Sequence, residues 1–319
     1  MEKLLEVKDL KVSFFTDLGE TQAVKGAGFA IGEGDFFGIV GESGSGKSVT
    51  TKSILRLGPS NCKIMGGEIL FRGEDILKKN EAELREIRGG EIAMIFQDSL
   101  SALNPVYTVG NKMVELIRRH TNMNKKEAKA RVLELLTAVG ITDPEKAMNS
   151  YPHELSGGMR QRVMIAMAMS SDPKILIADE PTTALDVTIQ AQILHLLLEL
   201  RKKNNMSIIL ITHDLGVVAQ TCKRVAVMCG GYVVEEGTVE EIFLHPGHPY
   251  TQALIASMPR VGGTFEQFLE RDLSDGNGDL CPFLNRCKYA DKTCEACLPK
   301  YYEASEGHRI FCHRREEKR

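Results

Sequence analysis

Residues 41–48 read Gly-Glu-Ser-Gly-Ser-Gly-Lys-Ser and fit the pattern G-x-x-x-x-G-K-[ST] of a phosphate-binding loop. An apolar run at 36–40 precedes the octet, and a helical pattern at 49–57 follows it. A glycine-rich turn between a strand and a helix points backbone N–H groups toward a phosphate. We expect Lys47 to reach the β- and γ-phosphates and Ser48 to ligate Mg²⁺. The loop residues expected at the nucleotide are Gly41, Ser43, Gly44, Ser45, Gly46, Lys47 and Ser48.

An acidic pair, Asp179 and Glu180, follows a second apolar run at 175–178. Parallel sheets bind ligands at the C-terminal ends of their strands. We expect Asp179 to hold Mg²⁺, directly or through water, and Glu180 to polarise the attacking water as general base. An isolated pair of this kind would more often be a solvated strand end. Together with the phosphate loop, it predicts a hydrolytic site.

Residues 155–161, Leu-Ser-Gly-Gly-Met-Arg-Gln, overlap the start of a helical pattern at 159–170. Ser156 is placed to cap that helix. A helix N-terminus beside glycines can bind an anion. The sequence thus predicts two phosphate sites, although it has only one lysine-bearing loop.

In this order, the motifs resemble those of the ATP-binding subunit of an ABC transporter. Residues 155–161 match the signature sequence of that family, and Gln97, within Ile-Phe-Gln-Asp at 95–98, matches its Q-loop. Residues 184–186, Ala-Leu-Asp, match the D-loop, so Asp186 is expected at the nucleotide. The resemblance covers roughly residues 4–240.

Two further positions match the same family. His213 ends an apolar run and matches the switch histidine, which contacts the γ-phosphate and orients the water. Phe14 falls where the family stacks an aromatic ring on adenine, with Phe15 as the alternative. The resemblance implies ATP and Mg²⁺ as cofactors. Its implied catalytic residues are Glu180, His213 and Gln97, and Gln97 also senses Mg²⁺.

In this family the phosphate loop of one ATPase faces the signature of another, head to tail. Ser156 and Gly158 are therefore expected to act in trans on ATP held by a partner. ATP would close the pair and hydrolysis would release it.

The resemblance also implies the fold class. We expect an α/β ABC-type P-loop ATPase with a mixed sheet, N-terminal antiparallel strands over 4–31 and a helical subdomain at about 98–170. Residues 1–240 are predicted to form the nucleotide-binding domain, and residues 241–319 a small cysteine-rich extension.

Three short segments resemble those of the dipeptide/oligopeptide importer ATPases, a group that also contains nickel and some oligosaccharide importers. They are Ser-Ala-Leu-Asn-Pro at 101–105, Asp-Val-Thr-Ile-Gln-Ala-Gln at 186–192 and His-Pro-Tyr-Thr-Gln-Ala-Leu at 248–254. We expect an ATPase that energises peptide import. The alternatives are import of nickel, an oligosaccharide or another solute, a soluble ABC ATPase of translation or DNA repair, and an exporter ATPase.

The cysteines of the tail support this branch. Their spacing, Cys281-x5-Cys287-x6-Cys294-x17-Cys312, matches the peptide-importer ATPases, some of which hold a [4Fe-4S] cluster there. Four thiolates suit iron–sulfur or zinc by count. Cys297 departs from the family pattern and leaves zinc open as an alternative, together with unliganded thiols.

Composition limits the partners. The chain has 319 residues, a net charge of −3 and a hydrophobic fraction of 43%. The sequence has no long basic stripe, so we do not expect it to bind nucleic acid. No apolar run approaches the ~18 residues of a membrane span, and the N-terminus does not resemble a signal peptide. We therefore expect a peripheral protein on the cytoplasmic face of the membrane. The implied partners are two permease subunits, a second ATPase that may be a paralogue, and an extracytoplasmic binding protein.

Overall fold

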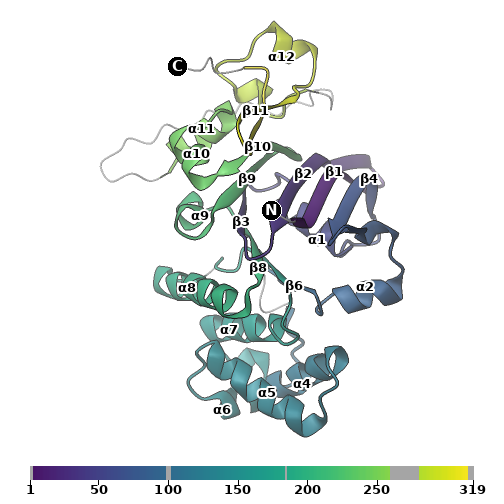
Figure 1. Ribbon diagram of the computed structural model, residues 1–319, viewed down its shortest axis with the longest axis vertical. Coiled ribbons are helices and arrows are strands. Elements are labelled where there is room, and N and C mark those ends of the chain that lie inside the picture. Colours follow the sequence, from purple (N-terminus) through teal and green to yellow (C-terminus); the bar gives the residue numbers. More distant parts are fainter. Residues whose placement is uncertain (1–2, 98–101, 184, 259–279, 315–319) are drawn as a thin grey trace.

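The computed structural model describes residues 3–97, 102–183, 185–258 and 280–314 (Figure 1). Three sequence motifs are incomplete there, because Asp98 of the Q-loop, Ser101 of the 101–105 segment and Ala184 of the D-loop lie outside these ranges. Residues 98–101 at the start of the predicted helical subdomain and 259–279 of the predicted extension lie outside them as well.

A four-stranded antiparallel sheet is built from the N-terminal part of the chain, in the order β2-β1-β4-β5. Its strands are β1 (Lys3–Thr16), β2 (Gly19–Gly32), β4 (Cys62–Phe71) and β5 (Glu74–Asp75). β1 and β2 form a long hairpin in which Phe14 lies opposite Thr21. The expected N-terminal antiparallel strands are confirmed.

The second sheet has eight strands in the order β11-β12-β10-β9-β3-β8-β7-β6. They are β3 (Phe36–Val40), β6 (Ile92–Ile95), β7 (Ile175–Asp179), β8 (Ser207–Thr212), β9 (Arg224–Cys229), β10 (Tyr232–Thr238), β11 (Tyr301–Ser305) and β12 (His308–Phe311). The five strands β6, β7, β8, β3 and β9 run parallel to one another. β10, β12 and β11 then join antiparallel beyond β9. Every residue of β3, β7 and β8 is buried, as expected of strands covered on both faces. The expected mixed α/β sheet is confirmed.

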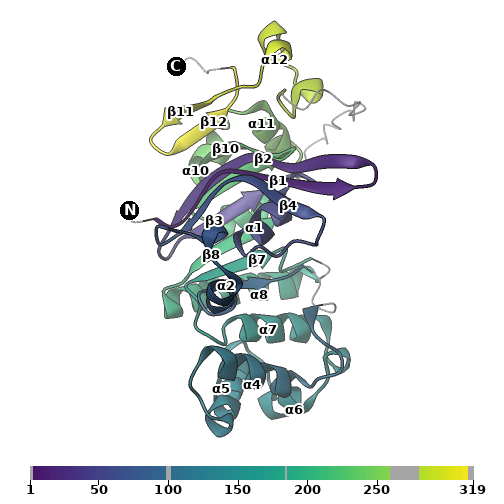
Figure 2. The same cartoon turned by 90° about the vertical axis from the view of Figure 1, so that its right-hand side faces the viewer.

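The helices fall into two groups (Figures 1 and 2). Those flanking the sheets or belonging to the C-terminal part are α1 (Lys47–Ile54), α2 (Glu81–Ile87), α8 (Val187–Asn204), α9 (Leu215–Thr221), α10 (Val239–Leu244), α11 (Pro249–Ala256) and α12 (Lys292–Ala296). Those at one end of the molecule are α4 (Val109–His120), α5 (Lys125–Ala138), α6 (Pro144–Asn149) and α7 (Gly157–Ala168). No helix within the described ranges is long and apolar enough to cross a membrane.

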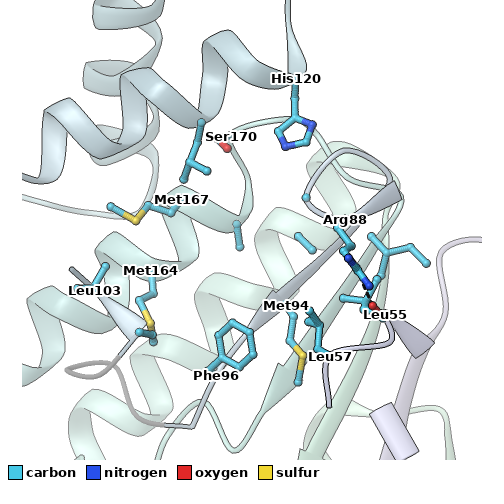
Figure 3. Close-up of a pocket in the computed structure, with 16 residues that line it drawn as sticks. Leu55, Leu57, Arg88, Met94, Phe96, Leu103, His120, Met164, Met167 and Ser170 are labelled. Carbon is cyan, nitrogen blue, oxygen red and sulfur yellow. Dashed lines mark hydrogen bonds between the residues drawn. The ribbon is translucent and has the colours of Figure 1, made fainter. Parts of the chain in front are cut away.

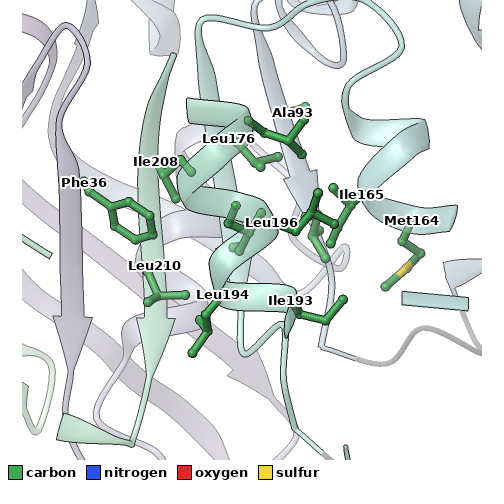
Figure 4. Packing of buried hydrophobic residues seen from close by; sticks show 14 of the residues in the cluster. Phe36, Ala93, Met164, Ile165, Leu176, Ile193, Leu194, Leu196, Ile208 and Leu210 are labelled. Atoms are coloured by element: carbon green, nitrogen blue, oxygen red, sulfur yellow. The ribbon is translucent and has the colours of Figure 1, made fainter. Parts of the chain in front are cut away.

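The core that fixes the ends of the parallel strands lies between α8 and the sheet (Figure 4). Leu197 of α8 and Leu176 and Leu210 of the sheet are fully buried in this cluster. Burying each such side chain contributes about 1.5–3 kcal/mol before the entropy of ordering is subtracted. This packing holds the C-terminal ends of β7 and β8 in place, where the acidic pair and His213 follow.

The C-terminal residues complete the eight-stranded sheet. In β10, Glu235 lies opposite Ile310 of β12. The fully buried Glu235 carboxylate accepts from the N–H groups of Gly247 and His248 at 2.7 and 2.9 Å and contacts His308 Nε2 at 2.7 Å. Burial disfavours the charged imidazole, but the hydrogen bond and charge of Glu235, with Glu241, outweigh it and raise the pKa of His308. The sheet therefore continues across residue 240, and the division of the chain there stays a prediction.

Candidate active site

The phosphate loop connects β3 to α1 with a backbone that requires glycine. Gly41, Gly44 and Gly46 have φ angles of 153°, 78° and 99°. A Cβ on Gly41 would lie 2.1 Å from the Met228 carbonyl oxygen, and one on Gly46 would lie 2.6 Å from that of Ala23. Both contacts are with backbone, which cannot rotate away. The loop is thus held closed around the N-terminus of α1.

Lys47 is the buried cation of this loop. Its ammonium group donates to the carbonyl oxygens of Gly41 and Glu42, both at 2.8 Å. Burial lowers the pKa of Lys47, and the nearby carboxylates, Glu180 first, oppose that shift. Gly46 caps α1 without a side chain. The first N–H groups of α1 can therefore bind an anion beside the ammonium.

Ser48 and Asp179 meet although 131 residues separate them. Ser48 Oγ donates to Asp179 Oδ1 at 2.7 Å, and Lys52 Nζ lies 3.9 Å from Asp179 Oδ2. Asp179 is almost fully buried, and burial raises its pKa against the opposing effects of Ser48 and Lys52. A hydroxyl and a carboxylate oxygen at the phosphate loop are the hard ligands that Mg²⁺ prefers. The two residues fit the predicted magnesium site.

The three predicted catalytic residues converge on the Glu180 carboxylate. Its Oε2 accepts from Gln97 Nε2 and Thr183 Oγ1, both at 2.8 Å, and its Oε1 lies 3.3 Å from His213 Nδ1. Glu180 has a φ of 46°, a left-handed conformation that costs a non-glycine residue about 1–2 kcal/mol. Its N–H nevertheless donates to Ile211 O at 2.9 Å. The strained turn and these four contacts fix the carboxylate at the end of β7.

The signature and D-loop residues lie elsewhere. Ser156 is the exposed N-cap of α7 and accepts from the N–H of Met159 at 3.3 Å. A Cβ on Gly158 would lie 3.1 Å from Ile189 Cγ2 of α8, the helix that Asp186 caps. The two motifs therefore face each other. They do not join the lysine-bearing loop, since α7 and α1 lie well apart in both views (Figures 1 and 2).

The aromatic residues proposed for adenine lie on the antiparallel sheet. Phe14 and Phe15 are adjacent on β1 and both are half-buried. Lys63 Nζ lies 5.2 Å from the centroid of the Phe15 ring. The described contacts assign adenine to neither ring, so Phe14 stays a prediction.

The four predicted cysteine ligands line one cavity in the C-terminal part. Cys281, Cys287, Cys294 and Cys312 surround a space of about 20 Å³, and burial raises the pKa of Cys281 to about 11. This space holds about one water molecule, whereas a [4Fe-4S] core has eight atoms. Within the described residues, no three His, Cys, Asp or Glu side chains are close enough together to hold a metal ion. The thiols fit in kind and neighbourhood, but the cavity would have to widen.

Several contacts have no motif that would have revealed them. Thr183 Oγ1 donates to the same Glu180 oxygen as Gln97 of the Q-loop. Cys297 Sγ lies 3.9 Å from His313 Nε2 and does not line the four-thiol cavity. At the phosphate loop, Glu42 contacts residues from the C-terminal part of the chain. Such contacts join segments that are distant in the sequence, and no periodicity or spacing in the sequence predicts them.

Comparison with known proteins agrees with this geometry over nearly the whole chain. Residues 24–183 match the ABC transporter family, and residues 234–294 match the oligopeptide/dipeptide transporter C-terminal region. The chain is 51% identical to the oligopeptide transport ATP-binding protein OppD of Bacillus subtilis, covering 97% of this chain and 88% of that protein. It is 49% identical to the dipeptide transport ATP-binding protein DppD of the same organism, covering 98% and 95%. It is 46% identical to DppD of Escherichia coli, covering 97% and 96%.

Solved structures share the ATPase fold. A dimeric ABC cassette bound to ADP and phosphate is 30% identical with a TM-score of 0.67, covering 74% of this chain and 98% of that one. The protein cbiO1 from Clostridium perfringens, part of an ABC transporter complex, is 30% identical with a TM-score of 0.65, covering 77% and 92%. The chain is therefore an ABC-type ATPase and belongs to the family of dipeptide and oligopeptide ABC transporter ATP-binding proteins.

Proposed function

We propose that this chain hydrolyses ATP to drive the import of dipeptides or oligopeptides across a membrane. The observation that carries the proposal is the match at residues 234–294 to the oligopeptide/dipeptide transporter C-terminal region, beside a complete set of ATPase motifs. Relatives named for dipeptide and oligopeptide transport cover nearly all of the chain and support the same assignment.

In hydrolysis, water would attack the γ-phosphate and ADP would leave, with Glu180 as the general base. Lys47 and the N–H groups of α1 would bind the phosphates, while Ser48 and Asp179 would hold Mg²⁺, which neutralises charge on the phosphate oxygens. Glu180 would accept a proton from the attacking water. His213, which lies near Glu180, would orient that water, and Gln97, which donates to Glu180, would sense Mg²⁺.

The second half of each ATP site would come from a partner ATPase. Ser156 is exposed at the start of α7, away from the lysine-bearing loop of its own chain. The related cassette solved with ADP and phosphate is dimeric. A head-to-tail pair would place Ser156 and Gly158 of one ATPase against ATP held by the other. The partner would be a second copy or a paralogue.

An apolar groove offers a docking place for the membrane subunits (Figure 3). It has a volume of about 270 Å³, and the lining includes Leu57, Met94, Phe96, Leu103, Met164 and Met167. Phe96 directly precedes Gln97, which donates to Glu180. We propose that a short amphipathic helix from each of two permease subunits occupies such a groove. Closure of the ATPase pair would then move the permease, and the chain would sit at the cytoplasmic face of the membrane with a binding protein on the other side.

The family spacing of four cysteines carries a finer proposal, a [4Fe-4S] cluster with zinc as the alternative, for which the cavity between them would have to widen. Cys281, Cys287, Cys294 and Cys312 would be the ligands, and the group would brace the C-terminal part. The expected result is iron and acid-labile sulfide in anaerobically purified protein. Zinc alone, or neither element, would refute the cluster. In the same proposal, residues 1–240 form the ATPase domain and 241–319 the extension.

The test of transport is affinity purification of the tagged chain from detergent-solubilised native membranes, followed by peptide uptake into reconstituted vesicles. We expect polytopic permeases and a second ATPase to co-purify, and uptake of peptides to require ATP. Phe96→Asp should release the permeases, whereas Leu18→Asp, at a fully exposed turn residue, should not. Recovery of soluble partners alone would overturn the importer assignment, and uptake of metal or sugar instead of peptide would redirect the substrate.

A further inference from the structure

Glu42, the second residue of the phosphate loop, is bound by two residues from the far C-terminal part of the chain. Its carboxylate accepts two hydrogen bonds from Arg286, from Nη1 to Oε2 at 2.8 Å and from Nη2 to Oε1 at 2.6 Å. Its backbone N–H donates to the Tyr250 hydroxyl at 2.9 Å. The first contact spans 244 residues of sequence and the second 208.

The same residue also positions the phosphate-binding cation. Lys47 Nζ donates to the backbone carbonyl of Glu42 at 2.8 Å. Three groups of Glu42 are therefore engaged at once: the carbonyl by Lys47, the amide by Tyr250 and the carboxylate by Arg286. The carbonyl is also held within the loop, by the N–H of Ser45 at 3.2 Å, whereas the amide and the carboxylate of Glu42 are held by the C-terminal part.

Arg286 is itself held in place. Its guanidinium lies 5.3 Å from the centroid of the Phe283 ring, which is buried and packs edge-on against Tyr250 at 5.4 Å. The hydrogen bonds from Arg286 lower the pKa of Glu42. Exposed ion pairs are usually weak, and the Glu42 side chain is 45% exposed. A bidentate, ring-stacked arginine is the exception, because its geometry is fixed in advance.

A second connection runs from the C-terminal part to the loop through the turn between β9 and β10. The Gly230–Gly231 turn donates from Gly231 N to Ser45 O of the loop at 3.1 Å. Pro282, the neighbour of Cys281, packs on Gly230 so closely that a Cβ there would lie 2.6 Å from Pro282 Cβ. The cysteine-bearing segment thus touches both Glu42 and the turn that supports the loop.

We propose that Arg286 and Tyr250 are positioning residues of the ATP site, which act through Glu42 on the phosphate loop and Lys47. The C-terminal extension is then part of the nucleotide site and not only an appendage. Losing these contacts releases the amide and the carboxylate of Glu42 and lets the residue whose carbonyl aligns Lys47 shift, so ATP binds less tightly. The general base at the end of β7 does not contact Glu42 within the described hydrogen bonds, so the chemical step is largely spared. The inference rests on ATP hydrolysis alone and is independent of the transported substrate.

The test is a double-mutant cycle on the full-length chain with its partner ATPase. Arg286→Ala, Glu42→Gln and the double variant are compared for ATP dissociation constant, KM and kcat. We expect each single variant to raise the dissociation constant and KM about tenfold, with kcat within about twofold. The double variant should be no worse than Arg286→Ala alone, because Arg286→Ala already removes the ion pair and both hydrogen bonds that Glu42→Gln weakens. Arg314→Ala, an exposed arginine of the same segment that stacks on Tyr289, is the matched control and should leave all three values unchanged.

Three results would overturn the proposal: unchanged ATP affinity in folded single variants, additive effects in the double variant, or a loss confined to kcat. Thermal melting identifies any variant that fails to fold. If Arg286→Ala does not fold, Glu42→Gln and Tyr250→Phe carry the test, since each removes one group and keeps the shape. Tyr250→Phe should raise the dissociation constant and leave kcat unchanged, and unaltered binding in both would refute the idea.

Discussion

Replacing Glu180 with glutamine separates proton transfer from every other role of this side chain. The carboxylate has three side-chain neighbours, with Gln97 and Thr183 donating to Oε2 and His213 near Oε1. A glutamine of the same shape can keep its amide oxygen at the Oε2 position and accept both hydrogen bonds. Its amide nitrogen then faces His213. The geometry is preserved, and the capacity to accept a proton from water is lost.

The expected cost follows from that difference. Removing a positioned general base slows a reaction by about 10²–10⁴-fold, which corresponds to about 3–5 kcal/mol on the barrier. Because the hydrogen bonds to Glu180 are retained, the free energy of unfolding should change by less than about 1 kcal/mol. ATP affinity should be unchanged, since Lys47 and Ser48 are untouched.

The assay is steady-state phosphate release from the purified transporter complex, with ATP binding measured separately by titration. Thr183→Val is the comparison, because it removes one hydrogen bond to Glu180 and keeps the base. It should slow turnover by about tenfold or less. Turnover of Glu180→Gln within tenfold of the unaltered protein would remove Glu180 from the base role, and equal losses in binding and turnover would indicate a structural defect instead.

Two further changes test the loop and the buried pair. Gly41→Ala should lower the free energy of unfolding by about 3 kcal/mol in a denaturant titration, because its Cβ would meet Met228 O at 2.1 Å, and wild-type stability would contradict the loop geometry. Since the pKa of His308 beside Glu235 is raised in the folded state, its contribution to stability is complete below about pH 6.5 and is lost as the pH rises through the folded-state pKa. His308→Gln should flatten that decline, whereas His195→Gln, at an exposed histidine, should not, and an unchanged profile in His308→Gln would exclude the pair.

The parts of the site that the sequence predicts are those written in local patterns. Lys47, Ser48, Asp179 and Glu180 each follow a short apolar run, and parallel strands bring the ends of such runs to one edge. Their convergence therefore follows once the sheet is recognised. The assignment of His213 and Gln97 needed the family resemblance, because a single histidine or glutamine has no chemical pattern of its own.

Other features were beyond sequence reasoning for a physical reason. The contact between Glu42 and Arg286 depends on how the C-terminal part packs on the loop, and a surface glutamate and an arginine carry no periodic signature. The pairing of β12 with β10 likewise joins strands separated by about seventy residues. The four cysteines predicted as cluster ligands line one cavity, but within the described residues their side-chain positions define no metal centre, so the cluster stays a proposal.

The pairing of β12 with β10 has a consequence for how the protein is made. Ribosomes synthesise the chain from the N-terminus to the C-terminus. β10 therefore emerges well before β12 (His308–Phe311). During that interval the hydrogen-bonding edge of β10 has no β12 to cover it, and Glu235 lacks His308. Unpaired strand edges attract other chains. Nascent chains that stall before β12 is made should therefore depend on chaperones more than chains in which β12 has paired with β10.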